Sequence, residues 1–80
     1  MRVKLRPDLK ELLGEVVKKQ RPDLVDLLSR LDNEDVEPEE VGALFDAAGD
    51  EFMATGLNDD DTLNQRGIHL EELIGGLRLP

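Results

Sequence analysis

Apolar residues recur at helical spacing along most of the chain. In RPDLKELLGEVVKKQ they fall at i, i+3, i+4, i+7 and i+8 and form one stripe, at Leu9, Leu12, Leu13, Val16 and Val17. A proline and an aspartate open this stretch and two lysines close it, which suits the positive N-terminal and negative C-terminal ends of a helix. The pattern predicts a helix over residues 7–20. The same opening recurs in RPDLVDLLSRL and predicts a second helix over residues 22–32.

A third helix is predicted over residues 38–55. Pro38 precedes two glutamates, and one face carries the apolar residues Val41, Leu44, Phe45, Ala48 and Phe52, with Met53 extending it. Gly42 and Gly49 lie inside this helix, where each costs up to about 1 kcal/mol relative to alanine. They indicate either the close approach of a neighbouring backbone or a helix of low stability. Gly56 then has the position of a C-cap.

The last predicted helix spans residues 62–75. Thr62 and Gln65 have the spacing of a capping box, and Gly75-Gly76 marks the expected end. The residues expected to face inward are Leu63, Leu70, Leu73, Ile74 and Leu77. Both chain ends alternate apolar and basic residues, which fits either a short β-like pairing of the two termini or frayed tails. We therefore expect one all-α domain over residues 1–80, a small bundle of about four helices.

Charge is distributed unevenly between the two parts of the chain. Residues 1–30 carry a net charge of +3, residues 31–80 carry −12, and no Lys or Arg occurs between Leu31 and Gln65. This imbalance argues against nucleic acid as a partner, because phosphates and acidic side chains repel each other. The chain contains no cysteine, no apolar run of membrane-spanning length and no secretion signal, so we expect a cytoplasmic protein.

Catalytic and metal-binding signals are weak. Ser29 is the only serine and lies in no nucleophile motif, and His69 is the only histidine, expected on the polar side of its helix. A calcium loop starting at Asp60 would place Thr62, Asn64 and Glu71 at ligand positions, but Gln65 stands where the loop's sharp turn requires glycine. We expect no enzyme, no cofactor and no metal site.

Acidic clusters are the strongest functional candidates. One lies before the third helix and the other before the fourth, and the candidate partner-binding residues are Asp32, Glu34, Asp35, Glu37, Asp59, Asp60 and Asp61. Such clusters either keep a small protein soluble or steer and hold a basic partner. The sequence favours a non-catalytic module that binds a basic protein. The alternative is a structural or oligomeric helical adaptor, such as a homodimer, that associates through an apolar stripe.

A resemblance adds to this interpretation. The segment DEFMATGLNDDDTLNQRGIHLEELI, residues 50–74, resembles the C-terminal part of short, uncharacterised acidic proteins of GC-rich bacteria. Their shared form is E-x3-TGL, an acidic run, N-x-RG and L-E-x-LI. In kind, the chain is similar to small acidic four-helix immunity proteins that neutralise nuclease toxins, although it lacks the paired tyrosines of the colicin type. This resemblance implies an inhibitor whose partner is a basic toxin domain.

Overall fold

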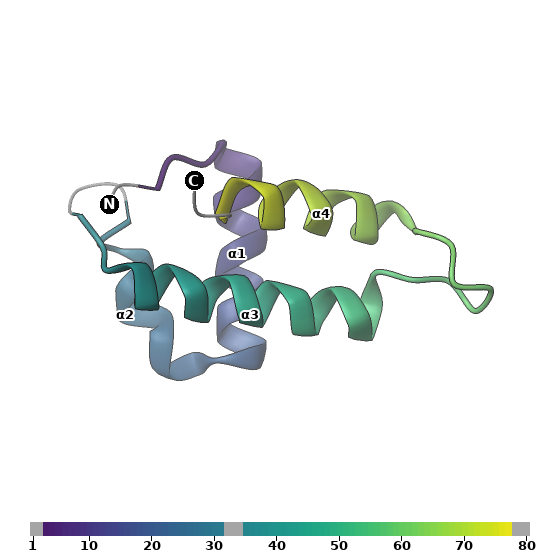
Figure 1. Ribbon diagram of the computed structural model, residues 1–80, viewed down its shortest axis with the longest axis horizontal. Coiled ribbons are helices and arrows are strands. Elements are labelled where there is room, and N and C mark those ends of the chain that lie inside the picture. The colour runs from purple at the N-terminus through teal and green to yellow at the C-terminus, as the bar shows by residue number, and fades with distance from the viewer. Residues whose placement is uncertain (1–2, 32–34, 78–80) are drawn as a thin grey trace.

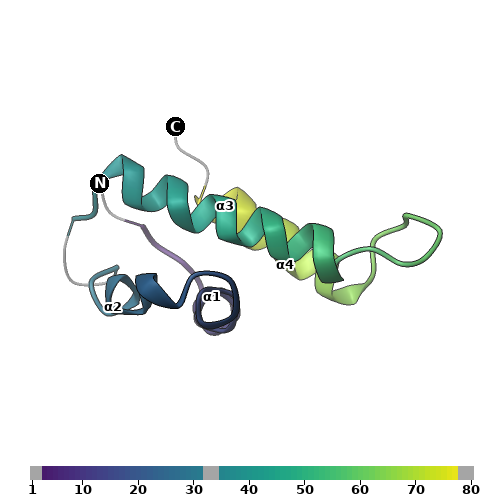
Figure 2. The ribbon, with the colours of Figure 1, turned by 90° about the horizontal axis from the view of Figure 1, so that it is seen from below.

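The fold consists of two layers of helices. The computed structural model describes residues 3–31 and 35–77, and its elements are α1 (Pro7–Gln20), the 3-10 turn η1 (Pro22–Leu24), α2 (Val25–Leu28), α3 (Pro38–Thr55) and α4 (Gln65–Leu77). Helices α3 and α4 run antiparallel as a hairpin, and α1 crosses behind them (Figure 1). Figure 2 shows α1 nearly end-on beneath this pair, with α2 beside it. The predicted all-α class is confirmed.

Helix α1 forms as predicted. Pro7 occupies the first turn with Asp8, and Lys18 and Lys19 lie in the last turn. All five apolar residues of the predicted stripe are buried, which are Leu9, Leu12, Leu13, Val16 and Val17. They pack against α3 and α4 to form the centre of the core.

The second predicted helix is shorter than expected. Regular α-helix covers only Val25–Leu28, because η1 precedes it and a tight turn follows, in which the Arg30 amide donates to the Leu27 carbonyl at 3.0 Å. The Ser29 hydroxyl donates to the Asp26 carbonyl at 2.9 Å, a local bond that competes with helix continuation. Leu31 is still buried, so the apolar pattern marked the right face but not the length of the helix.

Helix α3 begins and ends where predicted, but its apolar face is narrower. The Glu40 side chain accepts a hydrogen bond from the Glu37 amide at 3.0 Å and so caps the N-terminus of α3. Its buried residues are Val41, Leu44, Ala47, Ala48 and Glu51. Phe45 and Phe52 are only half-buried, and Met53 is 70% exposed, so the expected extension of the face to Met53 is wrong.

Helix α4 begins at Gln65, three residues later than predicted. The cap is Asn64 and not Thr62, because the Asn64 Oδ1 accepts a hydrogen bond from the Gly67 amide at 2.7 Å. Leu63 consequently lies before the helix and is 39% exposed, whereas Leu70, Leu73 and Leu77 are buried as expected. The helix also runs through Gly75-Gly76 to Leu77, since burial of Leu77 offsets the low helix propensity of glycine.

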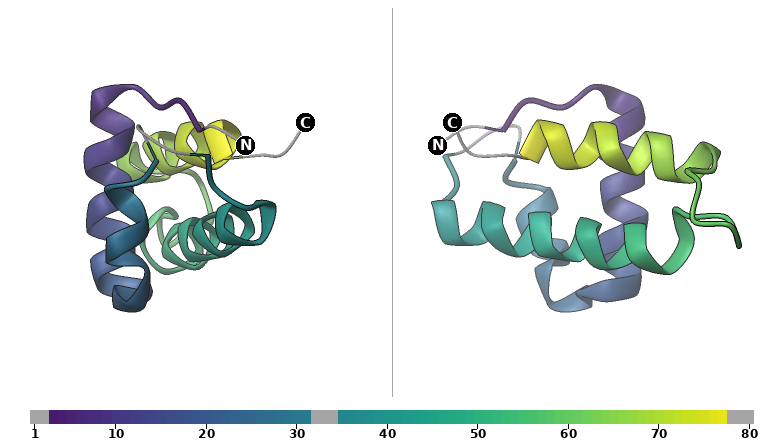
Figure 3. Two further views of the ribbon diagram at one scale, coloured as in Figure 1. Left: turned by 90° about the vertical axis from the view of Figure 1, so that its left-hand side faces the viewer. Right: turned by 45° about the vertical axis from the view of Figure 1, so that its right-hand side comes forward.

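The N-terminal segment packs on the core without forming a strand. Val3 is buried and Leu5 packs against the core, near Gly76. In the described part of the chain, the one β-bridge joins Leu57 to Leu63, inside the α3–α4 loop. Arg78 and Leu79, the other half of the expected terminal pairing, lie outside the described residues. Figure 3 shows the N-terminal segment running above the bundle to α1.

Candidate functional site

One carboxylate is buried at the centre of the packed helices. The side chain of Glu51, on α3, is 1% exposed, and both of its carboxylate oxygens accept hydrogen bonds from neighbouring side chains. Gln20 Nε2 donates to Oε1 at 2.8 Å, and the ammonium of Lys19 lies 3.0 Å from the same oxygen. Arg66 Nη2, from α4, donates to Oε2 at 2.9 Å. Glu51 therefore ties α1, α3 and α4 together through one group.

The neighbours of Glu51 keep it ionised. Burial raises the pKa of Glu51, but hydrogen bonds from Gln20, Arg66, Lys19 and Thr55 outweigh this effect and lower the pKa from 4.5 to about 2. The Thr55 hydroxyl lies 3.1 Å from Oε2 and accepts a bond from Arg66 Nε at 3.1 Å. Both oxygens of this carboxylate accept hydrogen bonds from the surrounding side chains, so we interpret the network as structural.

Two glycines join the C-terminus of α3 to the start of α4. A Cβ on Gly67 would lie 2.0 Å from the carbonyl oxygen of Gly56, so no larger residue fits there without moving the backbone. The Asn64 amide group donates to the Thr55 carbonyl at 2.8 Å, and its backbone N–H donates to Gly56 O at 3.1 Å. The pattern E-x3-TG and N-x-RG that carries the resemblance therefore corresponds to this junction and to the Glu51 network.

The same network determines the charge of the hairpin surface. Within residues 38–77, which are all described, Arg66 is the only Lys or Arg, and ten side chains are acidic. Arg66 is directed toward Glu51 and Thr55, with Glu15 at 3.6 Å. Seven of the acidic side chains are exposed and lie outside the ion pairs described here: Glu39, Asp46, Asp50, Asp59, Asp60, Asp61 and Glu71. The solvent-facing charge of the α3–α4 hairpin is therefore negative.

The predicted acidic residues do not come together. Asp35 and Glu37 precede α3, whereas Asp59, Asp60 and Asp61 follow it, so the 18-residue helix separates the two groups by about 27 Å. In Figure 1 they correspond to opposite ends of the molecule's long axis. Asp32 and Glu34 lie outside the described residues. The structure thus has two separate acidic clusters, which we call the α2–α3 cluster (Asp35, Glu37) and the loop cluster (Asp59–Asp61).

The loop cluster sits on an ordered turn. Asp60 Oδ1 accepts hydrogen bonds from the Thr62 hydroxyl at 2.6 Å and from the Thr62 amide at 3.2 Å, and these bonds lower the pKa of Asp60. Asp61 has a φ of 66°, in the left-handed region that aspartate tolerates. Asn58 donates through its side chain to the Thr62 hydroxyl at 3.0 Å. The three carboxylates are exposed, and hydrogen bonds among Asn58, Asp60 and Thr62 stabilise the turn that carries them.

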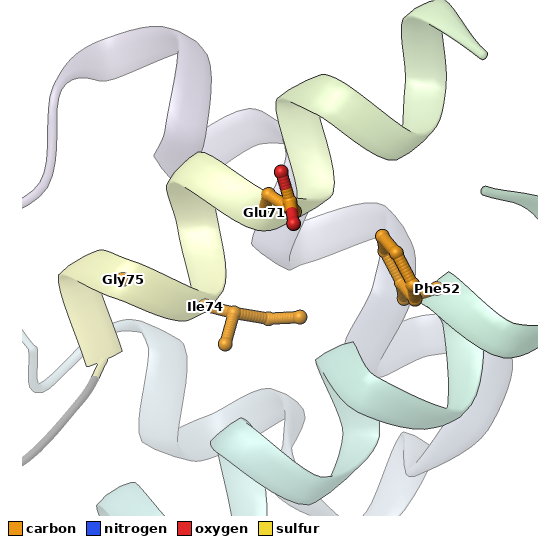
Figure 4. Close-up of a pocket in the computed structure, with 4 residues that line it drawn as sticks. All are labelled: Phe52, Glu71, Ile74 and Gly75. Carbon is orange, nitrogen blue, oxygen red and sulfur yellow. The ribbon is translucent and has the colours of Figure 1, made fainter. Parts of the chain in front are cut away.

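A shallow groove lies between the two helices of the hairpin. It has a volume of about 390 Å³ and is lined by Phe52, Glu71, Ile74 and Gly75. Figure 4 shows Phe52 and Ile74 facing the same space from α3 and α4, with Glu71 at its edge. Sequence reasoning assigned Phe52 and Ile74 to the core and did not identify this groove. The remaining lining glycine, Gly75, was expected to mark the end of the helix and gave no indication of a groove.

A second hollow, of about 170 Å³, lies between α1 and α4. His69 and Asp8 meet there at 3.1 Å, and Arg6 pairs with Asp8 and Glu72. Desolvation opposes the shift, but the bond to His69 and the charge of Arg6 lower the pKa of Asp8. His69, which was expected on the polar side of its helix, therefore also contacts α1 through Asp8. Across residues 3–31 and 35–77, no three His, Asp or Glu side chains form a metal-ligand set.

Comparison with protein-family models, curated proteins and solved structures finds no significant match to this chain. None of the helices in the described part of the chain combines the length and apolar character needed to cross a bilayer.

Proposed function

We propose that the protein is a non-catalytic binding module whose α3–α4 hairpin binds a basic protein surface. One observation carries this proposal: every solvent-facing charge within residues 38–77 is acidic, apart from the partly exposed Arg66 and His69, which pair with carboxylates. A surface that served only solubility would normally mix both signs. A uniformly acidic surface attracts cationic partners and repels other acidic molecules.

The spacing of the charges suggests separate contributions. The two acidic clusters lie about 27 Å apart, well beyond the Debye length of about 8 Å at physiological salt. Each cluster therefore acts on the nearest part of a partner and mainly raises the association rate. The groove between α3 and α4 supplies apolar surface through Phe52 and Ile74, and buried apolar contacts slow dissociation.

Within this class, we favour an inhibitor or immunity-type protein that covers a basic site on a toxin domain. Such a protein needs only a stable scaffold, a fast association rate and a negative surface. It would act in the cytoplasm, where it meets its partner before the partner reaches its target. The resemblance of residues 50–74 to short acidic bacterial proteins agrees with this role but assigns no activity.

Partner isolation followed by kinetics tests the proposal. We expect affinity capture from cells that produce the protein to yield a partner with a basic surface, and its association rate to fall steeply with ionic strength. Replacing Asp59, Asp60 and Asp61 with asparagine should slow association and flatten the salt dependence. An association rate that is unchanged at low salt would remove the loop cluster from the proposal.

A control variant separates local charge from net charge. The variant carries Glu11→Gln, Asp23→Asn and Asp26→Asn, which neutralise three exposed acids in the other helical layer. We expect this variant to bind at nearly the wild-type rate. Equal slowing by both triple variants would show that only the net charge of −9 matters and would contradict a binding role for the hairpin.

The alternative, an oligomeric adaptor, draws on the exposed apolar residues Met53, Ile68, Leu63 and Val25. Three of them lie on or next to the hairpin, where self-association would bring acidic surfaces together. Like charges at such an interface oppose pairing. Sedimentation at micromolar concentration distinguishes the two functions: a monomer fits the inhibitor, and a dimer insensitive to salt fits the adaptor.

A further inference from the structure

We propose that the groove between α3 and α4 receives one cationic amphipathic helix of the partner. This inference rests on the proposed function and specifies where and how the partner is bound. Its starting observation is the groove itself, an open space of about 390 Å³ with Phe52 on one side and Ile74 on the other. Both side chains are only half-buried, so each has apolar surface left to cover.

The shape of the site suits a helix. The groove runs between two antiparallel helices, and a third helix packs readily into such a surface by fitting its side-chain ridges between theirs. Gly75 lines the groove, and a Cβ placed on it would meet nothing within 4 Å. Gly49 lies one turn before Phe52 and is equally open. Neither glycine is needed for packing within the chain, and both allow a partner backbone to approach closely.

The charge of the site selects a cationic occupant. Glu71 stands at the edge of the groove, and Asp46 lies next to Gly49 on the adjoining surface of α3. The only Lys or Arg of the hairpin, Arg66, pairs with Glu51 on α3 at 2.9 Å and lies 3.6 Å from Glu15 on α1. A helix with leucines on one face and lysines flanking them would match both the apolar floor and the acidic edges.

A second copy of the chain fits less well. Its own α3–α4 face carries the same acidic residues, so a symmetric pairing brings carboxylates together. Eight of its ten Lys and Arg residues lie within residues 1–30, and the apolar stripe of α1 in that part is already buried in the core. Of the available occupants, a basic amphipathic helix from another protein is the one that the surface complements.

The test uses a synthetic peptide and the full-length chain. The probe is a lysine–leucine peptide of 18 residues, the length of α3, with leucines at i, i+3, i+4 and i+7. A second peptide has the same composition in scrambled order. We expect the amphipathic peptide to bind about tenfold more tightly than the scrambled one, because only the former buries apolar surface in the groove. Amide NMR shifts should change at Gly49, Phe52, Ile74 and Gly75.

Paired glycine variants locate the binding site. Gly75→Gln fills the groove and should weaken binding of the amphipathic peptide by about tenfold. Gly14→Gln is the matched control, because Gly14 lies inside α1, where an added Cβ also meets nothing within 4 Å. The control variant should bind as the wild type does. Thermal unfolding of both variants confirms that neither has lost the fold.

The outcomes separate this inference from the proposed function. Equal binding of the two peptides, or equal affinity of the Gly75→Gln and wild-type chains, overturns the groove inference but leaves a general acidic surface in place. If the chain dimerises and Gly75→Gln abolishes the dimer, a second copy occupies the groove and the inference is wrong. A different result would contradict the proposed function, namely a captured partner whose association rate changes neither with ionic strength nor on replacement of Asp59, Asp60 and Asp61.

Discussion

Replacing Glu51 with glutamine removes the buried charge while keeping the size of the side chain. The folded protein holds the pKa of this carboxyl at about 2 instead of 4.5, a difference of about 2.5 units. At about 1.4 kcal/mol per unit, ionised Glu51 contributes about 3–4 kcal/mol to the free energy of unfolding near pH 7. A domain of 80 residues has a total stability of roughly 4–12 kcal/mol, so the loss is a large part of it.

The pH dependence of this loss follows from the direction of the shift. Because the pKa of Glu51 is lower in the folded state, its contribution is fully present above about pH 4.5 and disappears as the pH falls toward about 2. The difference in unfolding free energy between wild type and Glu51→Gln should therefore shrink over that range. Other carboxyls with lowered pKa, such as Asp8 and Asp23, titrate in both proteins and cancel in the difference.

Urea unfolding monitored by circular dichroism, repeated across this pH range, measures the effect. Glu40→Gln is the control, because Glu40 pairs with Arg30 on a partly exposed surface, and such pairs contribute at most about 1 kcal/mol. Two results would refute the reasoning: a Glu51→Gln variant within 1 kcal/mol of wild type near pH 7, or a stability difference that stays constant down to about pH 2.

Three further substitutions, and one control, test the hairpin. Gly67→Ala places a Cβ 2.0 Å from the carbonyl of Gly56, and we expect a loss of more than about 3 kcal/mol or failure to fold, measured by thermal unfolding. Gly42→Ala has open space in the interior of α3 and should instead stabilise the protein by up to about 1 kcal/mol in the same assay. Asn64→Ala removes the cap of α4 and should cost about 1–2 kcal/mol in urea unfolding, whereas Asn58→Ala, in the exposed turn, should cost less.

The helix pattern was readable from the sequence because periodicity and caps are local. Pro7 and Pro38 begin α1 and α3 where proline is favoured, and the apolar stripe of α1 is buried as predicted. The predicted start of α4 was wrong because two residues, Thr62 and Asn64, both carry a side chain that is favoured at the N-cap of a helix. Only the contact with Thr55 and Gly56 selects Asn64, and that contact depends on the three-dimensional fold.

The candidate site was less predictable because it, too, depends on contacts between residues far apart in the sequence. The sequence showed which residues are acidic, but it did not show that the 18 residues of α3 place the two acidic clusters at opposite ends of the hairpin. From the sequence, Glu51 was indistinguishable from the exposed acidic residues around it, although it is buried. The available signal was Arg66, the only Lys or Arg within residues 38–77, which pairs with Glu51.

The close contact of Gly56 with Gly67 has a consequence for engineering. It brings the two ends of the α3–α4 loop together, and the Leu57–Leu63 bridge pairs the two chain segments that leave this junction. We therefore expect residues 59–61 to accept inserted peptides of different lengths without loss of the fold, because the contacts at the base of the loop do not involve these residues. The same molecule offers a display scaffold whose variable part is confined to one end.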